Sequence, residues 1–370
     1  MKFVIKKEEL VKKLAEISGL VGTKGAMPVL NHFLLAAGKD QCSIQATDLE
    51  TYLKMPLIAA VEMPGKICLP GRKLFEIVKE LDGGDVEFQA EGEGWMRVKA
   101  NGASFRLACL SASDYPAWPD MGEAEKITMP VAILSEMLDK SIYAAGESDT
   151  RYTLNGILFH LKPEGKQLAL VGTDGHRMAV ISKLLEAVSG EEKKVIIHRK
   201  AASELRKFLA GEGDVSLSFG KNHTLFSLQG VEFLTRLIEG AYPNYDQVIP
   251  TASEKKAVFD PETLVKALRR VSIMSRERAN AITIDTALNT FTVSSSNPDL
   301  GEAKDVVPVS FSGESLTIGF NAKYLIDALN AIGNGEKREI VFEFQDPLSP
   351  TLLTASGDDS YRCVVMPMRV

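Results

Sequence analysis

The segment from Val171 to Met178 carries the residue types closest to a catalytic pair. It reads Val-Gly-Thr-Asp-Gly-His-Arg-Met, which places Asp174 and His176 two residues apart. An aspartate that orients a histidine can make the imidazole a general base. On a strand the two side chains would share one face, but no nucleophile stands between them and no Gly-x-Ser-x-Gly elbow occurs nearby. The motif leaves an enzyme open as an alternative without indicating a reaction.

The remaining histidines, the cysteines and the glycine pairs do not form a site of known chemistry. They are His32, His160, His198 and His223, Cys42, Cys68, Cys109 and Cys363, and the glycines at 83–84 and 211–213. The histidines and cysteines lack the short spacings of zinc ligands. The glycines follow predicted helices, whereas the glycines of a phosphate-binding loop precede one. We therefore predict no metal, no cofactor and a non-catalytic protein.

The chain ends in an apolar, methionine-rich tail, Val-Val-Met-Pro-Met-Arg-Val. Val364 and Val365 are expected to pack in the core as the end of a strand. Met366 and Met368 have two interpretations, core packing or the lining of a groove, because flexible methionine side chains suit sites that accept several partners.

One pattern of helix, glycine stop and strand occurs three times. Its helices begin around Lys73, Lys200 and Lys323, which are 127 and 123 residues apart. A Thr-Asp pair at 47 returns at 173, and a Tyr-Pro pair at 115 returns at 242, spacings of 126 and 127 residues. Unlike motifs that share one period indicate copies of one domain.

Each copy is expected to contain two helices packed on antiparallel sheet, an α+β fold. The predicted helices are 8–18, 71–82, 130–143, 199–210, 261–278 and 322–333, with glycines near their C′ positions and with Pro130 and Pro261 in first turns. Linkers rich in Pro, Ser, Asp and Glu separate the copies. The predicted domains are 1–124, 125–252 and 253–370.

The formal net charge of −6 by itself argues against a nucleic-acid-binding protein. The six predicted helices, however, carry a net charge of +4, which leaves −10 for the rest of the chain. If the helices share one surface, that surface attracts phosphate groups while the remainder repels them. Charged helix faces can also be merely solvated. No zinc-finger or basic-zipper pattern is present, so contacts with nucleic acid would be to phosphates, without sequence readout.

The first residues are Met-Lys-Phe-Val-Ile-Lys-Lys, in which lysines interrupt the apolar residues. A signal peptide needs a longer apolar run, so we predict none. The sequence contains no run of eighteen uncharged apolar residues, so we predict no membrane-spanning helix. Widely spaced cysteines favour reduced, buried thiols. We therefore expect a cytoplasmic protein.

Seven motifs recur in an order and spacing that define a known family. They are Met1-Lys2-Phe3, Thr47-Asp48-Leu49-Glu50, Arg151-Tyr152-Thr153-Leu154-Asn155-Gly156, Thr173-Asp174-Gly175-His176-Arg177, Tyr242-Pro243-Asn244-Tyr245, Gly319-Phe320-Asn321 and Met366-Pro367-Met368-Arg369. Over its full length the chain resembles the bacterial DNA sliding clamps, the beta subunits of DNA polymerase III.

The resemblance implies a ring-shaped processivity factor. In this family two chains of three domains join head to tail around duplex DNA, with helices facing the hole. Polymerase, clamp loader and repair proteins are expected to dock through short linear peptides in a cleft between the second and third domains. The positions that match the family's cleft are Arg151, Thr153, Leu154, Thr173, Gly175, His176, Arg177, Met178, Pro243, Val248, Asn321, Tyr324, Leu348, Pro350, Val364, Met366, Pro367, Met368 and Arg369.

The family's other surfaces also match positions of this chain. The DNA-facing positions are Lys24, Arg72, Arg199 and Lys200, and the ring-closing positions are Phe105 and Leu107 in the first domain and Ile273 and Met274 in the third. Lys24 stands where the family often has arginine, which is the better fork for phosphate. Glu147 and Ser148 occupy a loop that elsewhere carries DNA contacts, so we expect little contact there.

A repeat scaffold that binds proteins but not DNA is the second alternative, beside an enzyme. Charge reversal at Arg199 and Lys200 distinguishes a clamp from a scaffold, because only the clamp needs cationic helices. A turnover that depends on His176 would instead indicate the enzyme.

Overall fold

The computed structural model describes residues 1–22, 27–39, 41–92, 94–186, 188, 190–251, 253–275, 280–333 and 338–369. Its contacts divide the chain into two units, of which the first contains Met1–Ala132 and Glu204–Leu237 and the second Ile133–Ser203 and Ile238–Val370. The predicted middle domain therefore contributes strands to both units.

The first unit contains two sheets. The five-stranded sheet consists, in order, of β5 (Ala59–Met63), β1 (Lys2–Lys6), β7 (Asp85–Ala90), β8 (Trp95–Ala100) and β9 (Ala103–Ala108). The eight-stranded sheet consists of β10 (Glu125–Pro130), β15 (Asp214–Phe219), β16 (His223–Leu228), β17 (Val231–Arg236), β4 (Thr51–Leu57), β3 (Cys42–Thr47), β2 (His32–Ala37) and β6 (Gly65–Pro70). Strands of the middle copy therefore continue a sheet of the first, through the antiparallel pair β17–β4.

The second unit repeats this arrangement. Its eight-stranded sheet consists of β14 (Lys193–His198), β11 (Gly156–Lys162), β12 (Gln167–Thr173), β13 (Arg177–Leu184), β25 (Asp358–Val365), β24 (Thr351–Ala355), β23 (Ile340–Glu343) and β18 (Lys256–Phe259). The four-stranded sheet consists of β21 (Gly301–Pro308), β20 (Thr290–Asn297), β19 (Ala281–Ala287) and β22 (Thr317–Asn321). The antiparallel pair β13–β25 joins strands of the middle and third copies.

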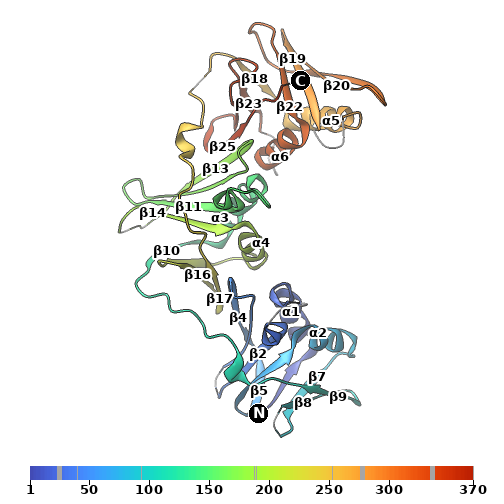
Figure 1. The fold of residues 1–370 in the computed structure, drawn as a ribbon, viewed down its shortest axis with the longest axis vertical. Coiled ribbons are helices and arrows are strands. Elements are labelled where there is room, and N and C mark those ends of the chain that lie inside the picture. Colours follow the sequence, from blue (N-terminus) through green and yellow to red (C-terminus); the bar gives the residue numbers. More distant parts are fainter. Residues whose placement is uncertain are drawn as a thin grey trace. The chain divides into compact units, whose positions relative to one another are not determined.

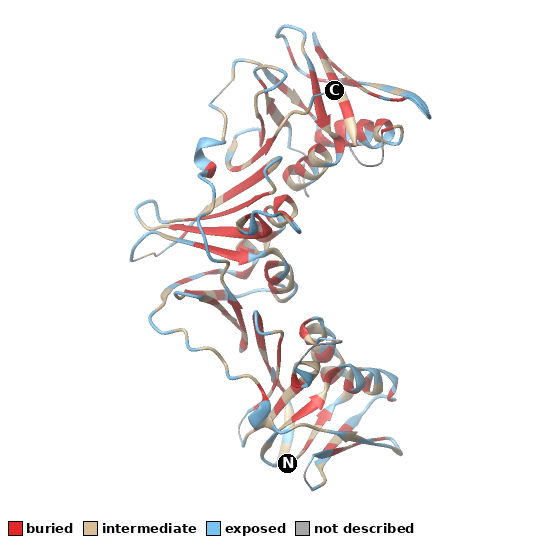
Figure 2. Cartoon of the chain, in the orientation of Figure 1, coloured by how far each residue is buried: buried red, intermediate tan, exposed pale blue. Residues whose placement is uncertain are grey.

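The helices are amphipathic and bury one face. They are α1 (Lys7–Ile17), α2 (Gly71–Glu80), α3 (Val131–Asp139), α4 (Arg199–Phe208), α5 (Pro261–Ser272) and α6 (Ala322–Gly333) (Figure 1). In α5 the buried Leu264, Leu268 and Val271 follow the helical period. Asp260 caps its first turn by accepting from the Thr263 N–H. Figure 2 shows this division between a buried and an exposed helix face.

Several helix ends differ from the predicted ones. Helix α3 begins at Val131, and Pro130 instead ends β10, where it pairs with Asp214. A proline is tolerated there because a strand end does not require its missing N–H. Helix α5 ends at Ser272, and residues 276–278 of the predicted helix lie outside the described residues.

The prediction of a glycine near C′ is wrong for α2, whereas after α4 Gly211 has the positive φ, 90°, that such a position requires. The residue that ends α2 is Leu81 in an extended conformation. Gly84 and Gly213 lie further along, at φ of +112° and +109°, where a side chain would be strained. Their carbonyls accept hydrogen bonds from Lys7 and Val131, the first residues of α1 and α3, both at 2.9 Å. Each glycine therefore helps to cap the other helix of its own copy.

The turn at each repeated Thr-Asp pair is also built alike. In the first copy Thr47 Oγ1 accepts from the residue 49 N–H at 2.9 Å, and in the second Thr173 Oγ1 accepts from the residue 175 N–H at 3.0 Å. Leu49 and Gly175 both have positive φ, 75° and 83°. The repeat detected by residue types is therefore a repeat of backbone conformation.

Candidate functional site

A cavity of about 140 Å³ opens in the second unit. Its lining comes from five places along the chain: the segment before β11, the β12–β13 turn, the start of β13, the segment 243–248 and the end of β25. The lining residues are Arg151, Leu154, Thr173, Gly175, Arg177, Met178, Pro243, Tyr245, Val248, Val364 and Met366. We call this cavity the cleft. Apart from Tyr245, every lining residue is one that the sequence predicted.

The β12–β13 turn fixes one wall of the cleft. Asp174 Oδ1 accepts from the N–H groups of His176 and Arg177, both at 3.0 Å. Gly175 permits the guanidinium of Arg151 to lie against the turn, because a Cβ at this glycine would be 2.7 Å from Arg151 Nη2. Asp174 is thus occupied with turn formation and with Arg177, which argues against its use with His176 as a catalytic pair.

Asp149 orients Arg151. Its Oδ1 accepts from Arg151 Nε at 2.9 Å and its Oδ2 accepts from Nη2 at 2.8 Å. The hydrogen bond from Arg151 lowers the pKa of Asp149 to about 2. A bidentate pair of this kind fixes the plane of the guanidinium as well as its position.

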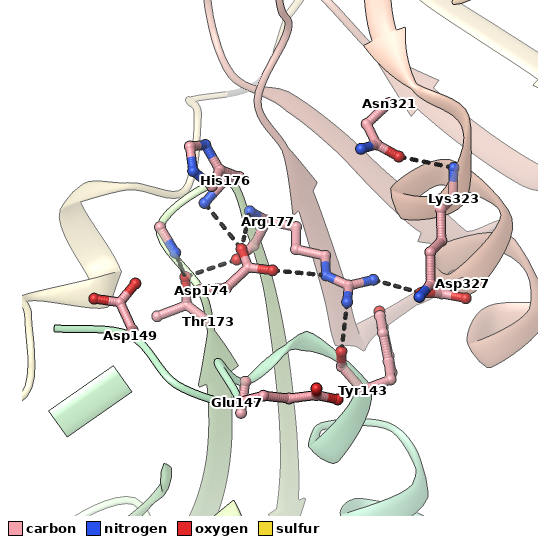
Figure 3. Close-up of polar contacts among 12 residues, drawn as sticks. Tyr143, Glu147, Asp149, Thr173, Asp174, His176, Arg177, Asn321, Lys323 and Asp327 are labelled. Carbon is pink, nitrogen blue, oxygen red and sulfur yellow. Dashed lines mark hydrogen bonds and ion pairs between the residues drawn. The ribbon is translucent and has the colours of Figure 1, made fainter. Parts of the chain in front are cut away.

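Arg177 lines the cleft and lies at the centre of a polar network (Figure 3). Its side chain is 10% exposed and donates to Asp174 at 3.1 Å and to Asp327 of α6 at 2.6 Å. Nη2 donates to the Tyr143 carbonyl at 2.7 Å, and the guanidinium lies 4.5 Å from the ring centroid of Tyr324. Two carboxylates and a carbonyl compensate the buried charge, so β13 is fastened to the third copy at this point.

The C-terminal tail closes the cleft on another side. Val364 and Val365 are buried, as predicted. Met366 lines the cavity and donates its N–H to the His176 carbonyl at 2.9 Å. Met368 leaves the cleft and bonds to Gly319 of β22. The two methionines that the sequence left open thus differ in role.

The remaining predicted cleft positions are described but are not among the lining residues. They are Thr153, His176, Asn321, Tyr324, Leu348, Pro350, Pro367, Met368 and Arg369. His176 and Tyr324 stack with ring centroids 6.5 Å apart and line a neighbouring cavity of about 580 Å³. Asn321 Oδ1 accepts from the Lys323 N–H in the first turn of α6, and Leu348 is 64% exposed.

Tyr245 is the lining residue that the sequence analysis missed. It lies in a 3-10 turn, η6 (Tyr245–Gln247), and its side chain is buried. The signal was present, because Tyr245 lies two residues after Pro243 and the first copy has Trp118 two residues after Pro116.

Three of the predicted DNA-facing residues are described, and each of them lies on a helix. Arg72 and Lys200 are exposed on α2 and α4. Arg199, also on α4, forms an ion pair with Glu147 at 2.7 Å. Lys24 lies outside the described residues. Over the observed bounds the helices contain 14 Lys and Arg against 10 Asp and Glu, so their net charge stays at +4.

The predicted ring-closing residues lie at sheet edges. Phe105 and Leu107 are on β9, the last strand of the five-stranded sheet. Ile273 and Met274 directly follow α5. An ion pair between Arg270 and Asp305 joins this helix to β21, which is the last strand of the four-stranded sheet. Phe105 is 36% and Ile273 75% exposed. An open strand edge with exposed apolar side chains can pair with another chain.

Within the described part of the chain, no group of three His, Cys, Asp or Glu side chains is placed to hold a metal ion. The same residues include no helix that is long and apolar enough to cross a membrane. Of the cysteines, three are buried and Cys109 is half-buried.

Comparison with known proteins assigns the family. The chain matches the family models of the DNA polymerase III beta subunit: the N-terminal domain over residues 1–119, the central domain over 128–244 and the C-terminal domain over 246–369. The fold and these matches together define a DNA sliding clamp of three domains. This chain belongs to the DNA polymerase III beta subunit family.

Curated and solved relatives agree over the full length. The beta sliding clamp of Salmonella typhimurium is 33% identical over 378 residues, and that of Escherichia coli K12 is 32% identical over 377, with all of each chain covered. The Pseudomonas aeruginosa sliding clamp bound to griselimycin matches with a TM-score of 0.94 and 32% identity, again with all of both chains covered.

Proposed function

We propose that this chain is the processivity factor of a replicative DNA polymerase, a non-catalytic cytoplasmic protein that encircles duplex DNA without sequence specificity. Two chains form a ring, head to tail. The contact joins β9, with Phe105, of one chain to the α5–β21 region, with Ile273 and Met274, of the other chain. The domains are those expected from the sequence, 1–124, 125–252 and 253–370. The observation that carries the proposal is the match to all three clamp domains over the whole chain.

The charge distribution supports encirclement rather than tight binding. The helices carry +4 within a chain of net charge −6. A ring holds DNA by its topology, so attraction to phosphates can stay weak enough for sliding. An acidic remainder disfavours adhesion to DNA elsewhere.

The helix face can be tested by reversing two adjacent charges. Arg199→Glu with Lys200→Glu removes positive charge from α4, so DNA synthesis tracts should shorten by roughly an order of magnitude because phosphate contacts set nonspecific affinity. The control is Lys166→Glu with Lys221→Glu, an equal charge change made in the β11–β12 and β15–β16 turns. Tract lengths on a primed circular template are the measurement. Equal lengths for all three proteins would favour a scaffold that does not contact DNA.

We further propose that the cleft is the docking site for polymerase, clamp loader and repair proteins, which present short linear peptides. A small apolar cavity with a polar rim suits such ligands. The rim is formed by Arg151, and the apolar part includes Met178, Val364 and Met366. Because each chain supplies one such cleft in this proposal, the partners compete for it.

Griselimycin is a usable probe because a related clamp binds it. Val248→Asp places a carboxylate at a lining residue that is 39% exposed, so folding should be spared while griselimycin binding weakens at least about tenfold, the cost of burying a charge. Leu184→Asp, at a 77% exposed position outside the lining, is the control. Isothermal titration calorimetry measures both. Unchanged affinity in Val248→Asp would contradict the assignment of the cleft.

A further inference from the structure

His160 is a buried titratable residue next to the cleft. It lies on β11 and is 2% exposed. Leu158, two residues earlier on the same strand, packs in a buried cluster with Val171, Met178 and Tyr245. Since alternate residues of a strand share a face, His160 points to the side of the sheet where Tyr245 lies.

Both ring nitrogens of His160 are engaged. Nδ1 lies 2.7 Å from the Tyr245 hydroxyl oxygen, and Nε2 lies 2.5 Å from Glu192 Oε1. An ionised carboxylate can only accept, so Nε2 carries the proton in the neutral ring. Nδ1 is then the acceptor, and the Tyr245 hydroxyl donates to it. The contacts thus define the order Tyr245 to His160 to Glu192.

Tyr245 connects this chain of hydrogen bonds to the cleft. Its ring packs with Met178 and Val364 in the buried cluster and lines the cavity beside them. The turn η6 that Tyr245 begins leads directly to Val248, another lining residue. A nearby anchor is the Tyr242 hydroxyl, which donates to the Val171 carbonyl at 3.2 Å. One wall of the cleft is therefore held by two tyrosine hydroxyls.

We propose that His160 is a positioning residue for the cleft: its neutral ring anchors η6 through Tyr245, and protonation of the ring weakens binding of the docking peptide. The inference rests on the proposed role of the cleft and concerns a residue that does not line it.

The physical reason is a change of donor and acceptor. A protonated His160 presents N–H on both nitrogens, so the Tyr245 hydroxyl can no longer donate to Nδ1. The hydroxyl proton of Tyr245 must then point away from His160. Tyr245 is only 4% exposed, so this proton is shielded from water. A buried donor without an acceptor is costly, so η6 shifts or loosens.

The charges around the ring act in both directions. Glu192, which precedes β14, favours the protonated ring, whereas Lys162 of β11 and Lys194 of β14 oppose it. Asp246 of η6 faces Lys162, 3.9 Å away. The neighbour of His160 on β12 is the uncharged Ala169. Burial is the largest influence and lowers the pKa of His160, despite the hydrogen bond with Glu192, which raises it.

The lowered pKa of His160 determines the direction in which the affinity of the cleft changes with pH. The neutral ring predominates above the ordinary histidine value of about 6.5. The stabilisation that it gives is complete there and is lost as the pH falls through the lower value of the folded protein. Affinity of the cleft should therefore fall on acidification through the lowered pKa of His160, which lies below the ordinary value.

The test is titration of the intact protein with griselimycin at about pH 8 and about pH 4.5, the second value lying well below the ordinary histidine pKa because that of His160 is lowered. The wild-type affinity should fall about three- to tenfold at the lower pH, the effect of one lost hydrogen bond. His160→Gln and Tyr245→Phe should each bind more weakly at the higher pH and show a flat pH profile. The double variant should be no weaker than the worse single variant, because both remove one interaction.

His176→Asn is the control, since His176 is a second histidine near the cleft, where it stacks on Tyr324. Whatever its affinity for griselimycin at the higher pH, this variant should still bind griselimycin more weakly at the lower pH. A fall that disappears in His176→Asn and persists in His160→Gln would overturn the proposal. A flat wild-type profile would overturn it too, while leaving the cleft intact. Absence of any griselimycin binding at the higher pH would instead contradict the proposed function of the cleft, and the role of His160 with it.

Discussion

At the scale of single residues, Gly175 and Arg177 show why the cleft has its present form. Gly175 takes a φ of 83° that favours glycine and leaves room for Arg151. Arg177 stays charged in the wall of the cleft because Asp174 and Asp327, which do not line it, compensate the charge. The residues that build this site therefore include several that a docking peptide need not touch.

Gly175→Ala tests the backbone requirement. A Cβ at this position meets Arg151 at 2.7 Å, and a left-handed conformation costs an L-residue about 1–2 kcal/mol. We expect the free energy of unfolding to fall by at least that amount in a urea titration, together with weaker griselimycin binding. Gly165→Ala is the matched control, because its Cβ would meet only Gln167 at 3.9 Å. Equal stability of the two variants would contradict this account.

The sequence predicted much of the cleft because its residues lie in distinctive motifs. Residues 173–178 and the methionine tail could be recognised one by one. Tyr245 was not predicted as a lining residue although it ends the motif Tyr242-Pro243-Asn244-Tyr245, because the motif alone does not report that its ring packs against the sheet beside the cavity. The His160–Tyr245 contact joins residues 85 positions apart, and no local pattern reports such a contact.

At the scale of elements, the first two copies share the Thr-Asp turn and the glycine that caps a neighbouring helix, and each of the three copies has three strands after its second helix. The period of about 125 residues predicted the copies, and helix α6 even has its predicted bounds. The sheet partners could not be predicted, because the pairs β17–β4 and β13–β25 join strands from different copies. Pairs of this kind join residues that are far apart in the sequence, and no local pattern reports them.

The open edges give a prediction at this scale. Ile273→Ala with Met274→Ala removes exposed apolar surface next to β21, so the protein should sediment as a monomer of 40.3 kDa instead of about twice that mass. Exposed apolar patches commonly mark such contacts. Leu184→Ala, at a 77% exposed position on β13, should sediment like the unaltered protein. An intact dimer in the double variant would remove Ile273 and Met274 from the ring contact.

At the scale of the whole molecule, the chain combines acidic overall charge with cationic helices and a sheet that continues from copy to copy within each unit. A ring made from such chains would retain DNA by enclosure and would need no base contacts. Enclosure has a consequence that ordinary binding lacks: escape requires a free DNA end or an opened ring.

Retention on DNA of different topology tests this claim most directly. The protein is loaded by a clamp loader onto a nicked circular plasmid, freed of unbound protein by gel filtration, and followed before and after a single restriction cut. We predict stable retention on the circle and rapid loss once the DNA is linear. Equal retention on circular and linear DNA would contradict encirclement.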